Sequence, residues 1–187
     1  MKPVEFKLLF SGPMGAGKTT AISTISDIPP VSTEARNTDL ERHGKTHTTV
    51  AMDYGEIALP GGEQLRLYGM PGQERFDFMW KISSKGALGV VLLSDNSRPD
   101  PLADLAPYIE AFADLAQSAA MVIGINRSNE GTTTLDDYLD WLERRDLRLP
   151  VFSVDVRQRD DVLLLLDALL SQIEAHNLLK TFSTSTA

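Results

Sequence analysis

The sequence contains no cysteine among its 187 residues. Disulfide bonds, thiolate zinc sites, iron–sulfur clusters and cysteine nucleophiles are therefore excluded. Basic residues are also scarce, with 18 Lys and Arg against 26 Asp and Glu and a net charge of −8. Because nucleic-acid binding depends mainly on basic side chains that neutralise phosphates, this balance argues against a nucleic-acid partner.

Long apolar runs are lacking as well, and none approaches the ~20 residues of a membrane span. The N-terminus lacks the apolar core of a signal peptide, and no cysteine is available for prenylation. These absences predict a cytoplasmic protein with no direct membrane anchor. The length predicts a single domain over residues 1–180, and Thr181–Ala187 is expected to be a disordered tail.

Short apolar runs alternate with helical patterns along the chain. Strands are expected at Phe6–Ser11, Thr49–Leu59, Gln64–Tyr68, Ala87–Ser94, Met121–Asn126 and Val151–Val154. Helices are expected at residues 18–26, 102–117, 135–145 and 160–175. A Pro-Gly-Gly turn at residues 60–62 joins the second and third strands as a hairpin. The order predicts an α/β fold with a mixed, mostly parallel six-stranded sheet and helices on both faces.

The turn after the first strand matches a phosphate-binding motif. Residues 12–19 fit G-x-x-x-x-G-K-[ST] at every required position, between a predicted strand and a predicted helix. Its glycines let several backbone N–H groups surround an anion, and the helix N-terminus adds its positive end. The sequence therefore predicts a P-loop NTPase fold that binds a nucleoside phosphate. The expected contacts are Gly12, Pro13, Met14, Gly15, Ala16, Gly17, Lys18, Thr19 and Thr20, with Lys18 on the β- and γ-phosphates and Thr19 on Mg²⁺.

Four later segments follow in a fixed order, at residues 49–54, 67–76, 126–129 and 153–155. Together with the phosphate loop they resemble the five guanine-nucleotide motifs of Ras-like small GTPases. Residues 72–76 (Gly-Gln-Glu-Arg-Phe) are similar to the switch II segment of Rab- and Arf-type members. Gly12-Pro13 and the acidic composition look closer to the prokaryotic group that includes the gliding-motility polarity GTPases.

This resemblance implies a nucleotide-dependent switch that binds GTP or GDP with Mg²⁺ and hydrolyses GTP. It implies a guanine pocket formed by Asn126, Arg127, Asn129, Ser153, Val154 and Asp155. In that pocket Asn126 would tie its loop to the phosphate loop, and the stem of Arg127 would cover the base. Members of the group often work with roadblock-type regulators, so a protein partner bound through the switch segments is expected, on a monomer or weak dimer.

Two segments are expected to respond to the γ-phosphate. Asp27–Thr48 is polar and too long for a simple connector, and loops of this length are usually functional. In GTPases a threonine of this segment meets Mg²⁺ and the γ-phosphate. Thr49 is the candidate and Thr48 the neighbouring alternative, although Thr49 also fits a plain strand residue. Arg36 and Arg42 in this loop are candidates for an arginine finger in cis, and Arg42 is preferred.

The second segment contains Gly72, which can bring a backbone N–H to the γ-phosphate. Gln73 can then orient the attacking water. The aromatic residues that follow, from Phe76 to Trp80, fit either core packing or a partner surface.

Three positions depart from the Ras-like pattern. Gly69 stands where the motif has the aspartate that holds a Mg²⁺ water, which predicts weaker Mg²⁺ binding unless another carboxylate replaces it. Met14 can displace the catalytic glutamine or obstruct an arginine finger. Asn129 replaces the aspartate that reads guanine, which predicts a loss of ~1–3 kcal/mol in guanine preference, although the adjacent Glu130 can supply a carboxylate.

These departures leave two alternatives open. One is a nucleotide-loaded signalling scaffold with little hydrolysis. The other is a P-loop ATPase of relaxed base specificity or a kinase, in which Asp95 at the end of its strand would bind the metal.

Overall fold

A seven-stranded mixed sheet forms the centre of the protein in the computed structural model, which describes residues 4–36, 49–73, 76–118 and 120–184. The strands lie in the order β2-β3-β4-β1-β5-β6-β7. Their bounds are β1 Glu5–Ser11, β2 Val31–Arg36, β3 Thr49–Ala58, β4 Gln64–Gly69, β5 Gly89–Asp95, β6 Met121–Asn126 and β7 Val151–Val154. Strands β4, β1, β5, β6 and β7 run parallel, whereas β2–β3 and β3–β4 pair antiparallel.

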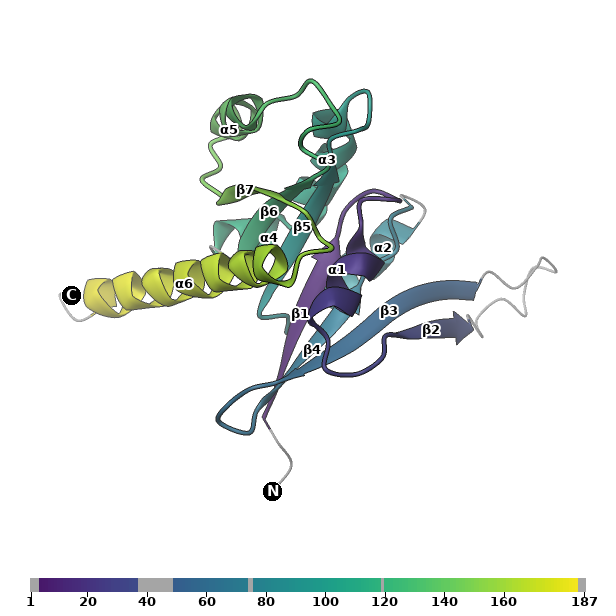
Figure 1. Ribbon diagram of the computed structural model, residues 1–187. Coiled ribbons are helices and arrows are strands. Elements are labelled where there is room, and N and C mark those ends of the chain that lie inside the picture. The colour runs from purple at the N-terminus through teal and green to yellow at the C-terminus, as the bar shows by residue number, and fades with distance from the viewer. Residues whose placement is uncertain (1–3, 37–48, 74–75, 119, 185–187) are drawn as a thin grey trace, which may run out of the picture.

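Helices cover both faces of this sheet (Figure 1). They are α1 Lys18–Ile25, α2 Asp77–Ser84, α3 Pro101–Ala111, α4 Ala113–Gln117, α5 Leu135–Glu143 and α6 Arg159–Thr184. Side chains alternate between two cores along the central strands, as the period of a strand requires. In β1, Leu8 and Phe10 face the core that contains α1 and α6, whereas Leu9 faces the core that contains α2, α3, α4 and α5. The predicted α/β architecture is confirmed.

The predicted strand count was one too low. Residues 31–36 lie in the segment expected to be a loop, yet they form β2 and pair with β3 from Val31↔Tyr54 to Arg36↔Thr49. The sequence Val-Ser-Thr-Glu-Ala-Arg is polar because β2 lies at the sheet edge, so it lacks the apolar run of a buried strand. The hairpin strand β3 is therefore interior, and β2 and β3 form an arm at the side of the molecule (Figure 1).

The C-terminal helix is longer than predicted. The first four residues of the expected tail continue α6 to Thr184, and the hydroxyl of Thr181 donates to the carbonyl oxygen of Asn177 at 3.0 Å. Threonine hydroxyls can bond to the carbonyl four residues earlier, so a Ser/Thr-rich composition does not prevent helix formation here.

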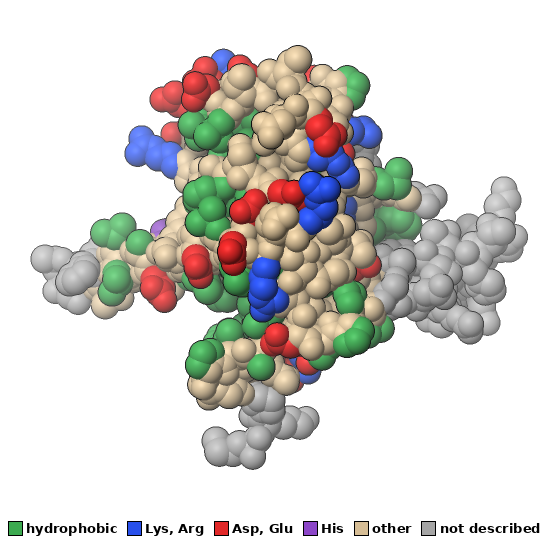
Figure 2. Space-filling view, viewed as in Figure 1, with side chains coloured by type: hydrophobic (Ala, Val, Ile, Leu, Met, Phe, Trp, Pro, Cys, Tyr) green, Lys and Arg blue, Asp and Glu red, His purple; other side chains and the backbone are tan. Residues whose placement is uncertain are grey.

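Within the described chain, one stretch of α6, Arg159–Leu179, is long and apolar enough to cross a membrane by length and composition. The sequence predicted no such stretch, so this is a correction: polar residues interrupt every continuous apolar run, but leucine, valine and isoleucine are frequent enough to keep the average hydropathy of the helix high. Val162, Leu165 and Leu169 are fully buried against the sheet, so one side of α6 packs into the core, while only 22% of the apolar stretch as a whole is buried. Apolar side chains are exposed at the projecting end of α6 (Figure 2).

Candidate nucleotide site

The phosphate loop connects β1 to α1 and packs closely on the sheet. Gly12, Gly15 and Gly17 have φ values of 132°, 86° and 101°, which residues with side chains rarely adopt. A Cβ at Gly12 would lie 2.1 Å from the carbonyl oxygen of Leu93 in β5. Gly17 is the N-cap of α1, and this helix end has neither a side-chain cap nor an acidic residue in its first turn. Its first N–H groups therefore suit an anion.

The ammonium of Lys18 lies inside this loop. Its Nζ donates to the carbonyl oxygens of Gly12 and Pro13, each at 2.8 Å. Burial lowers the pKa of Lys18 from 10.5 to about 8, although the negative charge of Asp53 opposes this shift. A buried cation is stabilised by an anionic partner, so the loop has both the donors and the charge that a phosphate group requires.

The chain after β4 lies directly against the phosphate loop. A Cβ at Gly72 would lie 2.6 Å from the backbone nitrogen of Met14 and 2.8 Å from Nζ of Lys18, so only glycine fits. The hydroxyl of Tyr108 in α3 donates to the Gly72 carbonyl oxygen at 2.9 Å. The indole N–H of Trp80 in α2 donates to the carbonyl oxygen of Pro71, also at 2.9 Å. The rings of Trp80 and Tyr108 pack with their centroids 4.4 Å apart. Helices α2 and α3 thus hold the Gly72 backbone beside the Lys18 ammonium.

Gln73 follows with an exposed side chain whose amide meets the Met14 sulfur. The next two residues, Glu74 and Arg75, lie outside the described chain. Gln73 and Met14, both singled out from the sequence, are therefore in contact at the mouth of the loop.

Oxygen ligands for a metal lie beside α1. The hydroxyl of Thr19 donates to Oδ2 of Asp53 in β3 at 2.5 Å. Hydroxyl and carboxylate oxygens fit Mg²⁺, and this ion usually completes its shell with phosphates and water. In the described part of the chain, no group of three or more His, Asp or Glu side chains could hold a metal.

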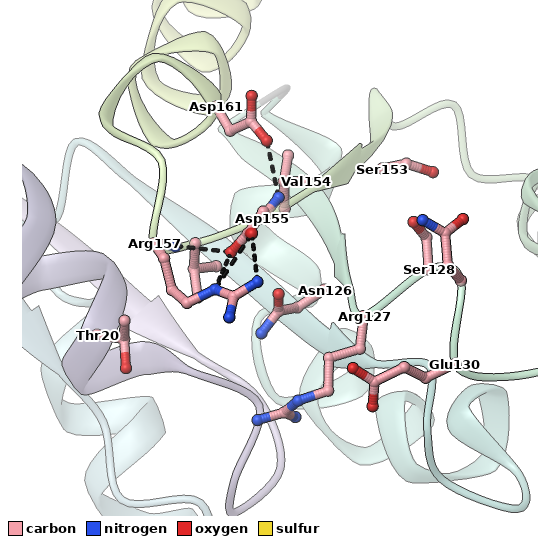
Figure 3. A pocket seen from close by; sticks show the side chains of 12 residues that line it. Thr20, Asn126, Arg127, Ser128, Glu130, Ser153, Val154, Asp155, Arg157 and Asp161 are labelled. Carbon is pink, nitrogen blue, oxygen red and sulfur yellow. Dashed lines mark hydrogen bonds and ion pairs between the residues drawn. The ribbon is translucent and has the colours of Figure 1, made fainter.

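A polar cavity of about 460 Å³ lies next to the loop (Figure 3). Its lining comes from α1, from the segment after β6, and from β7 and the start of α6: Thr20, Asn126, Arg127, Ser128, Asn129, Glu130, Ser153, Val154, Asp155, Val156, Arg157 and Asp161. The volume is in the range of small-ligand pockets. All six residues predicted for the base, and Thr20, are brought together here.

Two adjacent residues of this cavity, at the end of β6, fasten it to the phosphate loop. Nδ2 of Asn126 donates to the carbonyl oxygen of Ala16 at 3.1 Å. Arg127, with a φ of 54°, donates to the carbonyl oxygen of Gly15 at 3.1 Å and to Oδ2 of Asp95 at 2.6 Å. The guanidinium of Arg127 therefore bridges the phosphate loop and β5, while its stem lines the cavity.

Asp95, the alternative metal ligand, is fully engaged by protein groups. Its Oδ1 accepts from the backbone N–H and the hydroxyl of Ser97, and its Oδ2 accepts from Arg127. Partial burial raises the pKa of Asp95, but the hydrogen bonds from Ser97 and Arg127 outweigh it and leave the pKa below its ordinary value. This arrangement disfavours the reading in which Asp95 holds a metal.

The far wall of the cavity contains an ion pair that sequence reasoning did not predict. The guanidinium of Arg157 binds the carboxylate of Asp155 at 2.7 Å, as the dashed lines in Figure 3 show. This bond, with a second from the Arg157 backbone, lowers the pKa of Asp155 to about 2. The carboxylate of Asp161 at the start of α6 accepts from the Asp155 backbone N–H at 2.7 Å. The side chain of Asp155 therefore stays charged at neutral pH.

Two predicted catalytic residues have no described side chain. Arg42 lies outside the described residues, as does Thr48. Thr49 begins β3, and its backbone pairs with that of Arg36, which ends strand β2 and does not lie in a loop as predicted. Their predicted roles stay predictions.

Sequence reasoning missed Asp53, Tyr108 and Arg157 at the site. Aspartate is disfavoured inside a strand, so the presence of Asp53 in β3 was a weak signal that its side chain has a role at the site. Tyr108 gave no signal, because it fits the apolar face of a helix. Only the fold brings its hydroxyl to Gly72.

Comparison with known proteins adds a family. A family model described as "conserved hypothetical ATP binding protein" matches residues 10–149, a range that contains the phosphate loop, Gly72 and Asn126. An uncharacterized protein of Methanocaldococcus jannaschii is 30% identical over 98 residues, which are 52% of this chain and 56% of that relative. The chain thus spans about half the length of this relative. With most of its length matched and a complete phosphate loop, the chain belongs to the family of conserved ATP-binding proteins, and it is a nucleotide-binding protein of the P-loop kind.

Proposed function

We propose that the protein is a Ras-like small GTPase, a nucleotide-dependent switch that binds GTP or GDP with Mg²⁺ and hydrolyses GTP to GDP and phosphate. The position of Gly72 carries the proposal. Its backbone lies against both the Met14 amide and the Lys18 ammonium, and it is held there by Tyr108. A backbone N–H at this place suits recognition of the γ-phosphate, the group that distinguishes GTP from GDP.

In this proposal each part of the site has one task. Lys18 and the loop N–H groups neutralise and orient the phosphates, and Gln73 orients a water molecule. The water oxygen bonds to the γ-phosphorus as the bond to the β–γ bridging oxygen breaks, and the released products are GDP and phosphate. Bound Mg²⁺, held by Thr19, with Thr49 as a further ligand, supplies charge neutralisation on the phosphates. Arg42 is the proposed arginine finger, which would act in cis on the charge of the transition state.

The base is proposed to occupy the polar cavity. Asn126 and Arg127 fasten one side of this cavity to the phosphate loop, and the Asp155–Arg157 ion pair lines the other. The base edge would face Asn129 and the backbone of residues 153–155, which line the same cavity.

A protein partner would detect the bound nucleotide through α2. This helix exposes Phe78 and Ile82, with 49% and 65% of their surface accessible, directly after the segment that contains Gly72 and Gln73. Exposed apolar residues beside a nucleotide-sensing segment suit a protein partner. A roadblock-type regulator or another activator is the proposed partner of a cytoplasmic, monomeric or weakly dimeric protein with one domain over residues 1–180.

A second candidate is an ATPase switch of relaxed base specificity. Asn129 in place of aspartate and the ATP named in the family description favour it. Identification of the nucleotide that copurifies with the protein, followed by calorimetric titration with GTP and ATP, separates the two. We expect GDP or GTP in the purified protein; ATP bound at least as tightly as GTP would refute the guanine assignment.

Hydrolysis is tested separately from binding. Single-turnover release of phosphate should fall strongly in Gln73→Ala, while nucleotide affinity stays unchanged. Equal release from the wild type and the variant would favour the nucleotide-loaded scaffold, in which Gln73 has no catalytic role.

A further inference from the structure

Asp53 and Gly69 lie directly opposite each other on the antiparallel strands β3 and β4. A Cβ at Gly69 would be 3.0 Å from Cβ of Asp53 and 3.1 Å from its Oδ2. The Asp53 side chain therefore fills the space that a side chain at Gly69 would need. A carboxylate is present at this place in the fold, although the motif position itself has none.

This carboxylate faces the phosphate loop. Its Oδ2 accepts the hydrogen bond from the Thr19 hydroxyl at 2.5 Å, and its charge raises the pKa of Lys18 against the effect of burial. Thr19 is the residue of the loop suited to Mg²⁺. One strand of the sheet thus aims a carboxylate at the hydroxyl that would bind the metal.

A purely structural role for Asp53 has little support. The N-cap of α1 is Gly17, so Asp53 does not cap this helix. No ion pair within 4.0 Å joins Asp53 to a cation among the residues that the structure describes. Aspartate also has low strand propensity, so its presence in β3 does not stabilise the sheet.

We propose that Asp53 is the carboxylate of the Mg²⁺ site, acting from β3 in place of a residue at position 69, together with Thr19, Thr49 and the nucleotide phosphates. This inference rests on the proposed function, because the metal shell includes a nucleotide. It resolves the departure at Gly69, since the chain keeps the carboxylate and changes the strand that supplies it.

The test measures metal affinity directly. Full-length protein saturated with GDP, and in a parallel arm with ADP, is titrated with Mn²⁺, and free Mn²⁺ is followed by electron paramagnetic resonance. Asp53→Asn should weaken Mn²⁺ binding by about 10- to 100-fold, the usual effect of losing a partner close to a metal. Glu56→Gln is the matched control, because it removes one carboxylate from the same strand, and it should leave Mn²⁺ affinity unchanged.

A double variant moves the carboxylate from β3 to the paired position on the neighbouring strand β4. Asp53→Gly removes both Asp53 contacts of a new Cβ at position 69, which leaves only the flexible end of Ile22 at 3.1 Å. Asp53→Gly with Gly69→Asp should therefore recover most of the Mn²⁺ affinity that Asp53→Gly alone loses. Thermal unfolding without Mn²⁺ checks that each variant is folded.

The outcomes separate the inference from the function on which it rests. Wild-type protein that binds neither nucleotide, or binds Mn²⁺ equally with and without nucleotide, would refute the proposed function and the inference with it. Wild-type protein with nucleotide-dependent Mn²⁺ binding, together with an Asp53→Asn variant of equal affinity, would refute the role of Asp53 alone. A folded double variant with no recovered affinity would refute the exchange of positions.

Discussion

The amide Nε2 of Gln73 lies 3.9 Å from the sulfur of Met14, so the proposed catalytic glutamine rests on a side chain of the phosphate loop. Met14 is the third residue of the phosphate-binding motif, and its side chain is 66% exposed at the mouth of the loop. A side chain here competes with the water molecule that Gln73 would orient.

Shortening Met14 should therefore accelerate hydrolysis. In Met14→Ala the amide of Gln73 loses its sulfur contact, and single-turnover phosphate release should rise, by up to about 100-fold, because small displacements of a positioning group have effects of this size. Met14→Leu keeps the bulk of the side chain and should remain close to the wild-type rate. An unchanged rate in Met14→Ala would show that the contact does not restrain Gln73.

Lys18 should make stability depend on pH in a specific direction. Burial lowers its pKa from 10.5 in the unfolded chain to about 8 in the folded protein. Between these values the unfolded chain binds more protons, so the free energy of unfolding rises with pH from about 8 to 10.5, and this gain is lost as pH falls through 8. Below 8 the buried ammonium destabilises the fold.

Lys18→Met removes this group, so the variant should be more stable than the wild type at pH 7 without nucleotide. We expect a difference on the order of 1 to 3 kcal/mol that shrinks toward pH 10.5. Urea unfolding of both proteins at several pH values measures this difference in the free energy of unfolding. Ionisation of tyrosines affects both proteins equally, because they share those residues, and does not contribute to the difference. A constant difference across this range would contradict the prediction. The variant should also lose nucleotide affinity.

The glycines of the phosphate loop should differ in their tolerance of a methyl group. Both Gly12→Ala and Gly15→Ala place a side chain at positive φ, which costs about 1–2 kcal/mol. Only at Gly12 does the new Cβ meet backbone, at 2.1 Å from the Leu93 carbonyl oxygen, whereas at Gly15 the nearest atom is 4.0 Å away.

Gly12→Ala should therefore cost about 1–3 kcal/mol more than Gly15→Ala, because β5 must shift to accept it. Chemical denaturation of the two variants at one pH gives the comparison. Equal destabilisation would mean that φ strain, and not the packing of the loop on β5, decides the choice of glycine.

Asn129 should set the base preference. Its amide offers one acceptor where a carboxylate offers two, and one unmade hydrogen bond costs ~1–3 kcal/mol. Asn129→Asp should raise the ratio of GTP to ATP affinity by about 10- to 100-fold. Glu130→Gln is the companion variant, since Glu130 lines the same cavity. A drop in the GTP to ATP ratio in Glu130→Gln would indicate that Glu130 already supplies the carboxylate, and Asn129→Asp would then change little.

Local signals in the sequence were sufficient for much of this protein. Glycine spacing within a short segment predicts the phosphate loop and the helix that follows it. Continuous apolar runs predict the buried strands β1, β5 and β6. The pairing of segments 126–129 and 153–155 around one cavity also followed, because parallel strands end at one edge of the sheet.

Other features depend on residues that meet only after folding. The edge strand β2 is polar, so it becomes recognisable only through its pairing with β3. The hydroxyl of Tyr108 reaches Gly72 across 36 positions of the sequence, and no local pattern encodes that distance.

The sequence by itself determined that this chain binds a nucleoside phosphate, because the motif at Gly12–Thr19 uses backbone groups whose geometry glycines impose locally. Only the tertiary structure decided which carboxylate stands beside Thr19. The register of β3 on β4 sets Asp53 over Gly69, and register is fixed by the packing of both strands in the sheet, which no single segment contains.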